Sequence, residues 1–587
     1  QQAAVGAITG EDGFNWGYDP HHFTVPEGSY ATEPDGSARI LEFREMVQAL
    51  NSIGIHVVMD VVYNHTNASG LAEKSVFDKV VPGYYHRLNN GGNVERSTCC
   101  ENTASEHLMM EKFMIDSVLT WATEYEVDGF RFDLMGHHML SNMVHLRQAL
   151  DALPNGDKIY VYGEGWNFGE VADNARGVNA VQLNIGGSGI GVFNDRLRDG
   201  ARGGGPFDAL NLQGFATGLY FQPNALENRP ADEQKSKLLS YMSWIRVGLT
   251  GNLREYLFPD GTTGVGISYN GALAGYTRDP QENIIYVSAH DNETLWDAVQ
   301  AKAPAEAGIP ERIRMHNLAM DLVMLSQGVP FFHAGDELLR SKSLDRNSYN
   351  SGDWFNKLDF TYTSNNWAVG MPPKGDNADK YPLVQPLLAN PALQVSQADI
   401  LGSLAHFETM LQVRKSSALF RLRTEADVKQ RMQFFNVGRE AVPGLVVYQL
   451  NNADANRLPD SFDQIVVLFN GSPETITFGD SAFAGAAYEL HPVQAASVDA
   501  VVKQATFDTA SGAFSVPGLT TAVFVVKNAS FVEPQPEPTV IAVAPTAVPQ
   551  GGAEPSTPAQ PLSLAWPIVI IMAGVLAVMA FVARRRS

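Results

Sequence analysis

The fold of this chain is decided by the stretch Gly129-Phe130-Arg131-Phe132-Asp133. Apolar residues at helical spacing precede it, and the stretch itself is typical of a short buried strand that ends in a charged residue. Side chains two positions apart on a strand share one face, so Arg131 and Asp133 are expected side by side. The arginine would then keep Asp133 ionised and oriented, as a nucleophile requires. A catalytic carboxylate and a structural Arg–Asp pair are equally good interpretations of this segment alone.

The same alternation of helical patterns and buried strands continues from about residue 10 to 365. It predicts an α/β fold with a parallel sheet, a (β/α)8 barrel of the TIM type, in which active sites gather at the C-terminal strand ends. Eight strands close a barrel, so we expect this one to lack its first strands, in a chain that continues a longer protein. The expected strands are 55–62, 129–133, 159–163, 284–288, 329–333 and a sixth near 246–252.

The composition indicates a protein with real cores and a neutral substrate. The chain has 587 residues, 44% of them apolar and 10% aromatic, which is enough for two or three domains. Acidic residues outnumber basic ones by 64 to 42, and the net charge of -22 repels nucleic acid. We therefore expect no nucleic-acid partner.

The C-terminal third is expected to hold a second domain and an anchor. Residues 1–400 are assigned to the catalytic barrel and 401–530 to a helix and a β-sandwich of short alternating strands. A Pro-rich linker (531–563) and a charge-free stretch (564–583) follow, and the latter predicts a transmembrane helix rather than a buried core helix. The basic tail 584–587 is then cytoplasmic, and the protein is displayed on the cell surface with its catalytic part extracellular.

Two further carboxylates end expected strands. Glu164 lies between two glycines, which we expect to let a sugar approach closely, and is followed by Trp166. Asp291 follows His290 at the end of another strand. A pair of carboxylates at strand ends suits glycoside hydrolysis, which needs a proton donor and a nucleophile. A turn glutamate beside a core tryptophan is the alternative interpretation of the second segment.

Four stretches, in the same order, resemble the signature regions of the α-amylase superfamily of glycoside hydrolases: 60–65, 129–133, 163–164 and 290–291. Within that superfamily, residues 15–20, 162–166 and 290–297 resemble type I pullulanases and limit dextrinases. The resemblance extends over about residues 10–530. It implies a retaining glycoside hydrolase that cleaves α-1,6 branch linkages in pullulan or in starch- or glycogen-derived glucans.

The resemblance also implies a role for each site residue. Asp133 is the expected nucleophile, Glu164 the acid/base and Asp291 the stabiliser of the reacting sugar. The expected substrate-binding residues are Tyr18, which stacks on the sugar, with His65, Arg131, Trp166 and His290. An α-1,4-acting or transglycosylating relative, and a non-catalytic surface protein that binds glucan, are the competing interpretations.

No cofactor is expected for the chemistry, although the resemblance allows a structural Ca²⁺ whose ligands the sequence does not name. The two cysteines, Cys99 and Cys100, are adjacent. Their α-carbons are about 3.8 Å apart, below the usual disulfide range of about 4.4–6.8 Å, so two thiols are preferred over a vicinal disulfide. Zinc is not expected, because no second set of Cys or His stands nearby at ligand spacing.

Overall fold

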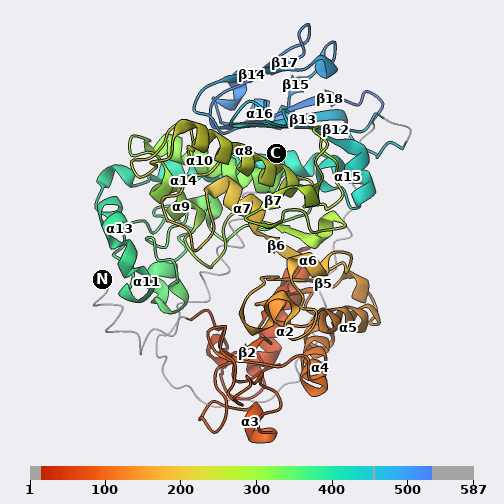
Figure 1. Ribbon diagram of the computed structural model, residues 1–587, viewed down its shortest axis with the longest axis vertical. Helices are drawn as coiled ribbons and strands as arrows, with labels where there is room; N and C mark the ends of the chain where they lie inside the picture. Colours follow the sequence, from red (N-terminus) through yellow and green to blue (C-terminus); the bar gives the residue numbers. More distant parts are fainter. Residues whose placement is uncertain (1–14, 454–455, 532–587) are drawn as a thin grey trace, which may run out of the picture. The chain divides into compact units, whose positions relative to one another are not determined.

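The computed structural model of the protein describes residues 15–453 and 456–531. Within them, a six-stranded sheet runs in the order β1-β4-β5-β6-β9-β10, with every neighbouring pair parallel (Figure 1). Spatial order follows chain order, as in the wall of a barrel. The strands are β1 (Val58–Val61), β4 (Gly129–Phe132), β5 (Tyr160–Gly163), β6 (Gly191–Asn194), β9 (Asn283–Ile285) and β10 (Val329–Pro330).

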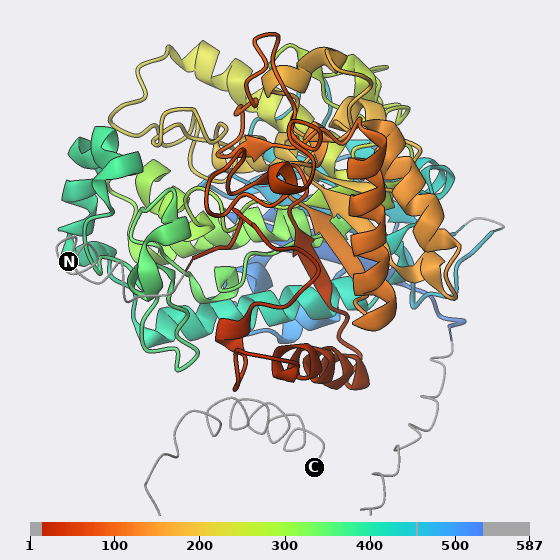
Figure 2. The ribbon, with the colours of Figure 1, turned by 90° about the horizontal axis from the view of Figure 1, so that it is seen from below.

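Amphipathic helices connect these strands and cover the sheet. Helices α4 (Leu108–Glu124) and α5 (Leu140–Asp151) pack side by side and are the orange helices on one flank in Figure 2. Their apolar faces meet Phe130 and Phe132, which have no exposed surface. Burying each phenylalanine contributes about 1.5–3 kcal/mol, so β4 is firmly held. The other long helices near the sheet are α2 (Ala38–Ser52), α7 (Asp195–Arg202), α8 (Ala231–Leu249), α9 (Leu295–Lys302) and α10 (Ile309–Met324).

Five of the six expected strands are present, and a different segment forms the sixth strand of the sheet. Residues 246–249 are the end of α8, and the strand beside β5 is β6, in a glycine-rich stretch. The helix was mistaken for a strand because Ile245, Val247 and Leu249 are all buried, which removes the polar face that marks a surface helix.

An antiparallel β-sandwich follows the barrel-like part, as expected. One sheet has the order β11-β12-β13-β18-β15 and the other β14-β17-β16. Phe483, Phe514 and Phe524 belong to the apolar core of this sandwich. The helix expected before the sandwich is α14 (Gln397–Lys415). The strands are β11 (Met432–Phe435), β12 (Leu445–Asn451), β13 (Phe462–Asn470), β14 (Ile476–Gly479), β15 (Glu489–Leu490), β16 (Thr506–Asp508), β17 (Ala513–Val516) and β18 (Thr520–Lys527).

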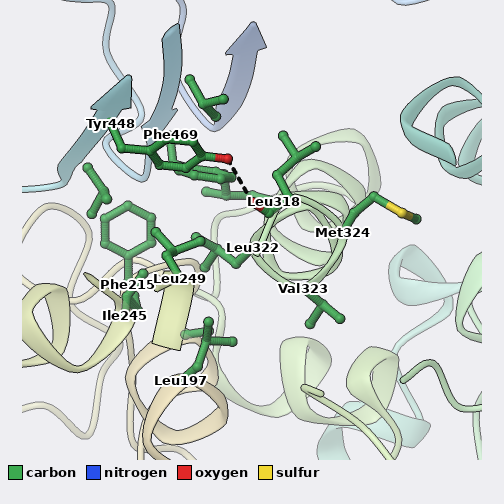
Figure 3. Packing of buried hydrophobic residues seen from close by; sticks show 14 of the residues in the cluster. Leu197, Phe215, Ile245, Leu249, Leu318, Leu322, Val323, Met324, Tyr448 and Phe469 are labelled. Atoms are coloured by element: carbon green, nitrogen blue, oxygen red, sulfur yellow. Dashed lines mark hydrogen bonds between the residues drawn. The ribbon is translucent and has the colours of Figure 1, made fainter. Parts of the chain in front are cut away.

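The barrel helices and the sandwich share one hydrophobic core. Side chains from α7, α8 and α10 meet those of β12 and β13, as Figure 3 shows for Leu249, Leu322 and Phe469. The Tyr448 hydroxyl donates a 2.7 Å hydrogen bond to the carbonyl of Leu325 at the end of α10. All described residues therefore fall in one compact unit.

The predicted membrane anchor is corrected here. No helix in the described part of the chain combines the length and the apolar character that crossing a membrane requires. The stretch 564–583 that predicted such a helix lies outside the described residues, as do the linker 531–563 beyond its first residue and the tail 584–587. Within the described residues the fold is an α/β domain with β-sheet layers and no membrane-spanning helix, and the cell-surface location that depended on such a helix is not carried further.

Candidate active site

The site is built on Arg131, which lies in the middle of β4 and is only 6% exposed. Because side chains alternate along a strand, Phe130 and Phe132 enter the core while Arg131 and Asp133 face the other way. The parallel register places Asp60 of β1 beside Arg131 on one side and Tyr162 of β5 on the other. Three neighbouring strand ends therefore converge on one guanidinium.

Arg131 forms ion pairs with three carboxylates. Its Nη1 lies 2.9 Å from Asp60 Oδ1 and 3.3 Å from Asp133 Oδ1, and its Nη2 lies 2.7 Å from Glu164 Oε1. The planar guanidinium therefore holds the carboxylates of Asp133, at the end of β4, and Glu164, at the end of β5, in fixed positions relative to each other. The expected nucleophile and the expected acid/base are thus brought together.

The main chain joins the same two strand ends. The backbone N–H of Leu134, the residue after Asp133, donates a 2.8 Å hydrogen bond to Glu164 Oε2. Leu134 has a positive φ of 40°, a conformation that non-glycine residues rarely adopt and that here aims its N–H at the carboxylate. Asn64 completes the contacts of Asp133 by donating from Nδ2 to Oδ2 at 3.3 Å.

The charge balance of the site differs from the sequence expectation for Asp133. Burial and then the negative charge of Glu164 raise the pKa of Asp133 well above its usual range, while Arg131 lowers it. Arg131 was expected to keep Asp133 ionised, but one guanidinium is shared among three carboxylates. The cluster consequently retains a proton at a pH where an isolated aspartate has lost it.

The glycines beside Glu164 are required by close packing of the backbone. A Cβ at Gly163 would lie 2.5 Å from the Phe132 carbonyl oxygen, and one at Gly165 would lie 2.9 Å from the Gln182 backbone nitrogen. Both positions require glycine because neighbouring backbone approaches closely. Trp166 packs, partly buried, against a small cluster that contains Phe193 and Tyr286.

An aromatic platform covers the acidic cluster. The rings of Tyr18 and His290 are stacked, with centroids 5.1 Å apart and an interplanar angle of 16°, and Trp16 meets His290 edge-on at 4.8 Å. The Tyr18 hydroxyl donates to Asp60, and the Tyr18 carbonyl is hydrogen-bonded by His65 Nε2. Burial lowers the pKa of His290 to about 4, so this ring is neutral near neutral pH.

Asp291 lies at the rim of the cluster. Its carboxylate is 3.6 Å from His290 Nε2, and 47% of its side chain is exposed. The negative charge of Asp291 contributes to the raised pKa of Asp133, which places it within electrostatic reach. Part of the Asp291 side chain is therefore open to solvent.

Three residues that make contacts in the site were not singled out from the sequence: Asp60, Asn64 and Lys342. Asp60 and Asn64 lie inside the stretch 60–65, and a polar strand end was the signal that could have found them. Lys342 comes after β10 and carries no such signal. Its Nζ donates a 2.6 Å hydrogen bond to the His290 carbonyl and lies 5.3 Å from the centroid of the Trp16 ring.

The described residues contain one group of three His, Cys, Asp or Glu side chains with converging ligand atoms: His65, Cys99 and Cys100. The two cysteines are joined by a disulfide, in contrast to the two thiols that the sequence favoured.

A parallel barrel-type sheet that brings an Asp and a Glu together at adjacent strand ends is an arrangement typical of barrel-type glycoside hydrolases. Comparison with known proteins narrows this class. Residues 362–527 match the family described as "Alpha-1,6-glucosidases, pullulanase-type, C-terminal". The chain is 48% identical over 541 residues to pullulanase 1, chloroplastic, of Arabidopsis thaliana, covering 89% of this chain and 56% of that protein.

Bacterial pullulanases and their crystal structures are also similar to this chain. The pullulanase of Klebsiella pneumoniae is 42% identical over 89% of this chain and 48% of its own length. A crystal structure of Klebsiella pneumoniae pullulanase complexed with maltotriose superposes with a TM-score of 0.84 at 40% identity, covering 90% of this chain and 50% of that chain. The chain spans about half the length of the relatives it matches. The resemblance to pullulanase-type debranching enzymes of the α-amylase superfamily is confirmed.

Proposed function

We propose that this chain carries the catalytic centre of a retaining glycoside hydrolase that cleaves α-1,6 branch linkages in α-glucans. The observation that carries the proposal is the shared binding of Asp133 and Glu164 by Arg131, reinforced by the Leu134 N–H. Retaining hydrolysis requires two carboxylates that flank one glycosidic bond, one to attack and one to donate a proton.

Asp133 would attack the anomeric carbon and form a covalent glycosyl–enzyme intermediate. Glu164 would protonate the departing glycosidic oxygen and then, as a base, activate the water that releases the sugar. The two carboxylates therefore need to hold one proton between them when substrate arrives. The raised pKa of Asp133, caused by burial and by the neighbouring Glu164 charge, supports the retention of such a proton in the cluster.

The remaining residues would bind the sugar at the reacting position. Tyr18 and His290 offer a stacked aromatic surface, and Trp166 lies beyond Glu164 at the end of β5. Asp291 would bind hydroxyls of the reacting sugar and stabilise its positive charge. The proposed enzyme needs no cofactor for its chemistry. The proposal includes a structural Ca²⁺, but we assign it no ligands.

The preference for α-1,6 linkages rests on the relatives rather than on the site geometry. The matching family is described by that activity, and a related pullulanase has been crystallised with maltotriose. An α-1,4-acting or transglycosylating relative would share the same carboxylate pair, and a surface glucan-binding protein would need no such pair.

One assay separates these possibilities. The full chain is incubated with pullulan, and the products are resolved by chromatography. Maltotriose as the product supports α-1,6 hydrolysis, and longer oligosaccharides indicate transfer. A pattern of α-1,4 scission contradicts the linkage preference, whereas the absence of products from a folded protein that still binds pullulan contradicts the hydrolase.

A further inference from the structure

The disulfide between Cys99 and Cys100 lies beside the acidic site. Cys100 directly precedes β3 (Glu101–Asn102), which pairs with β2 (His65–Thr66) so that His65 is opposite Asn102. The pairing of these two short strands brings the cysteines next to His65. Cys99 is exposed to solvent, whereas His65 is 2% exposed.

Three metal-binding atoms converge there. Cys99 Sγ lies 3.6 Å from His65 Nε2, although the residues are 34 positions apart. The ligand atoms of His65, Cys99 and Cys100 all lie within 4.8 Å of one another. Two sulfurs and one imidazole nitrogen form a donor set that zinc prefers. No local sequence pattern indicates this set, because the pairing of β2 with β3, rather than sequence proximity, supplies the histidine.

The closed disulfide cannot use its sulfurs as ligands, because thiolates are needed to bind zinc. An external dithiol can open it: two electrons and two protons pass to the S–S bond, which breaks to give two thiols, and the dithiol becomes a disulfide. The bond joins neighbouring residues, so it closes no loop whose entropy would stabilise it. The exposure of Cys99 gives an attacking thiolate direct access.

We propose that reduction of Cys99–Cys100 creates a zinc site at the rim of the acidic cluster, formed by the two thiolates and His65 Nε2. Two protons leave as the thiols bind the metal. Three protein ligands leave a fourth tetrahedral position for water. The three ligand atoms already lie within 4.8 Å of one another, close to the spacing of ligands around one zinc ion.

Zinc in this position disturbs the active site through hydrogen bonds already present. Asn64 Nδ2 lies 2.8 Å from His65 Nδ1, so Nδ1 accepts from the amide and Nε2–H donates to the Tyr18 carbonyl. Zinc on Nε2 removes the bond to Tyr18 and leaves the imidazole proton on Nδ1, facing the Asn64 amide. Asn64 also donates to Asp133, so metal binding reaches the carboxylate. The inhibition that follows rests on the proposed function, whereas the metal site does not.

Cobalt is the probe for the site, because tetrahedral Co²⁺ bound to thiolates absorbs strongly in the visible and near-ultraviolet. The full chain is reduced, freed of reductant without oxygen, assayed for thiols and titrated with Co²⁺ and then with Zn²⁺. We expect two thiols and one tetrahedral Co²⁺ per chain, displaced by one Zn²⁺. The oxidised chain, which needs no substitution, should give no such absorption.

Substitutions identify the ligands. Cys99→Ser and Cys100→Ser should each abolish the thiolate absorption, and His65→Gln should weaken Co²⁺ binding by about 10-fold or more. The proposal is overturned if the folded chain yields no thiols under reductant, if reduced and oxidised chains bind equally, or if either serine variant keeps the absorption. A chain that binds Co²⁺ as expected but hydrolyses no pullulan would contradict the proposed function and leave the metal site in place.

Discussion

The Leu134 backbone N–H lies 2.8 Å from Glu164 Oε2, so the main chain just after Asp133 holds the carboxylate of the next strand. A backbone donor does not depend on the Asp133 side chain. The position of Glu164 is therefore set largely by the path of β4 and β5, with Arg131 as its second support. This independence allows each carboxylate to be changed without displacing the other.

Asp133→Asn is expected to reduce turnover of pullulan by about 10³-fold or more, because an amide cannot attack the anomeric carbon. The amide has nearly the same shape, and Arg131 and Asn64 remain in place. The rate of maltotriose release and the thermal unfolding midpoint measure the two properties. Activity within tenfold of the native chain would remove Asp133 from the role of nucleophile.

The same variant is expected to be more stable at neutral pH. Burial and the Glu164 charge raise the pKa of Asp133 in the folded protein above the ordinary value of 3.8, so the folded state binds a proton that the unfolded state has released. Stability then falls as pH rises above this ordinary value and continues to fall up to the raised folded pKa. The native chain should lose stability relative to Asp133→Asn over this window. Parallel curves of unfolding free energy against pH would contradict the raised pKa.

Arg131→Met is expected to lower the free energy of unfolding by about 3–5 kcal/mol at neutral pH, since it leaves carboxylates in the site without their cation. The loss should shrink in acid, where those carboxylates are protonated. Lys112→Ala is a matched control, because the Lys112–Asp116 pair is 58% exposed on both sides and an exposed pair contributes at most about 1 kcal/mol. Denaturant unfolding at two pH values provides the measurement. Equal losses for the two variants would show that Arg131 does not hold the cluster.

Local sequence patterns predict the proposed catalytic carboxylates of this site, but they do not predict the contacts that depend on how the strands pair. The strand end at Asp133 and the acid at Glu164 are visible because an apolar run stops at a charged residue. The sharing of Arg131 with Asp60 depends on the register of two parallel strands, which no single segment encodes. The strand β6 was missed because its flanking glycines resembled a loop, and α8 was misassigned because burial on all sides hides its helical period.

Tyr18→Phe tests the platform above the cluster. The ring remains stacked on His290, but the hydroxyl that donates to Asp60 is lost. A hydrogen bond to a charged group contributes about 1.5–3 kcal/mol, so its loss leaves the ring less firmly positioned, and kcat/KM should fall by about 10-fold. Tyr18→Ala should lower kcat/KM further, because it also removes the stacking surface. If the phenylalanine and alanine variants both match the native chain in kcat/KM on pullulan, the platform has no part in binding the reacting sugar.

His406→Gln tests the packing of α14 on α10, where His406 Nε2 lies 2.9 Å from Asp321 Oδ1. Burial lowers the pKa of His406, but the Asp321 carboxylate raises it more, so the net pKa lies above the ordinary 6.5. The stabilisation is therefore fully present below about pH 6.5 and is lost as pH rises through the folded pKa. The substitution should lower the free energy of unfolding by about 1–3 kcal/mol below pH 6.5. The loss should be smaller at alkaline pH. His56→Gln is the control, since His56 pairs with Asp128 but is 77% exposed. A cost for His406→Gln that is the same across this range would show that the ion pair does not stabilise the packing of these helices.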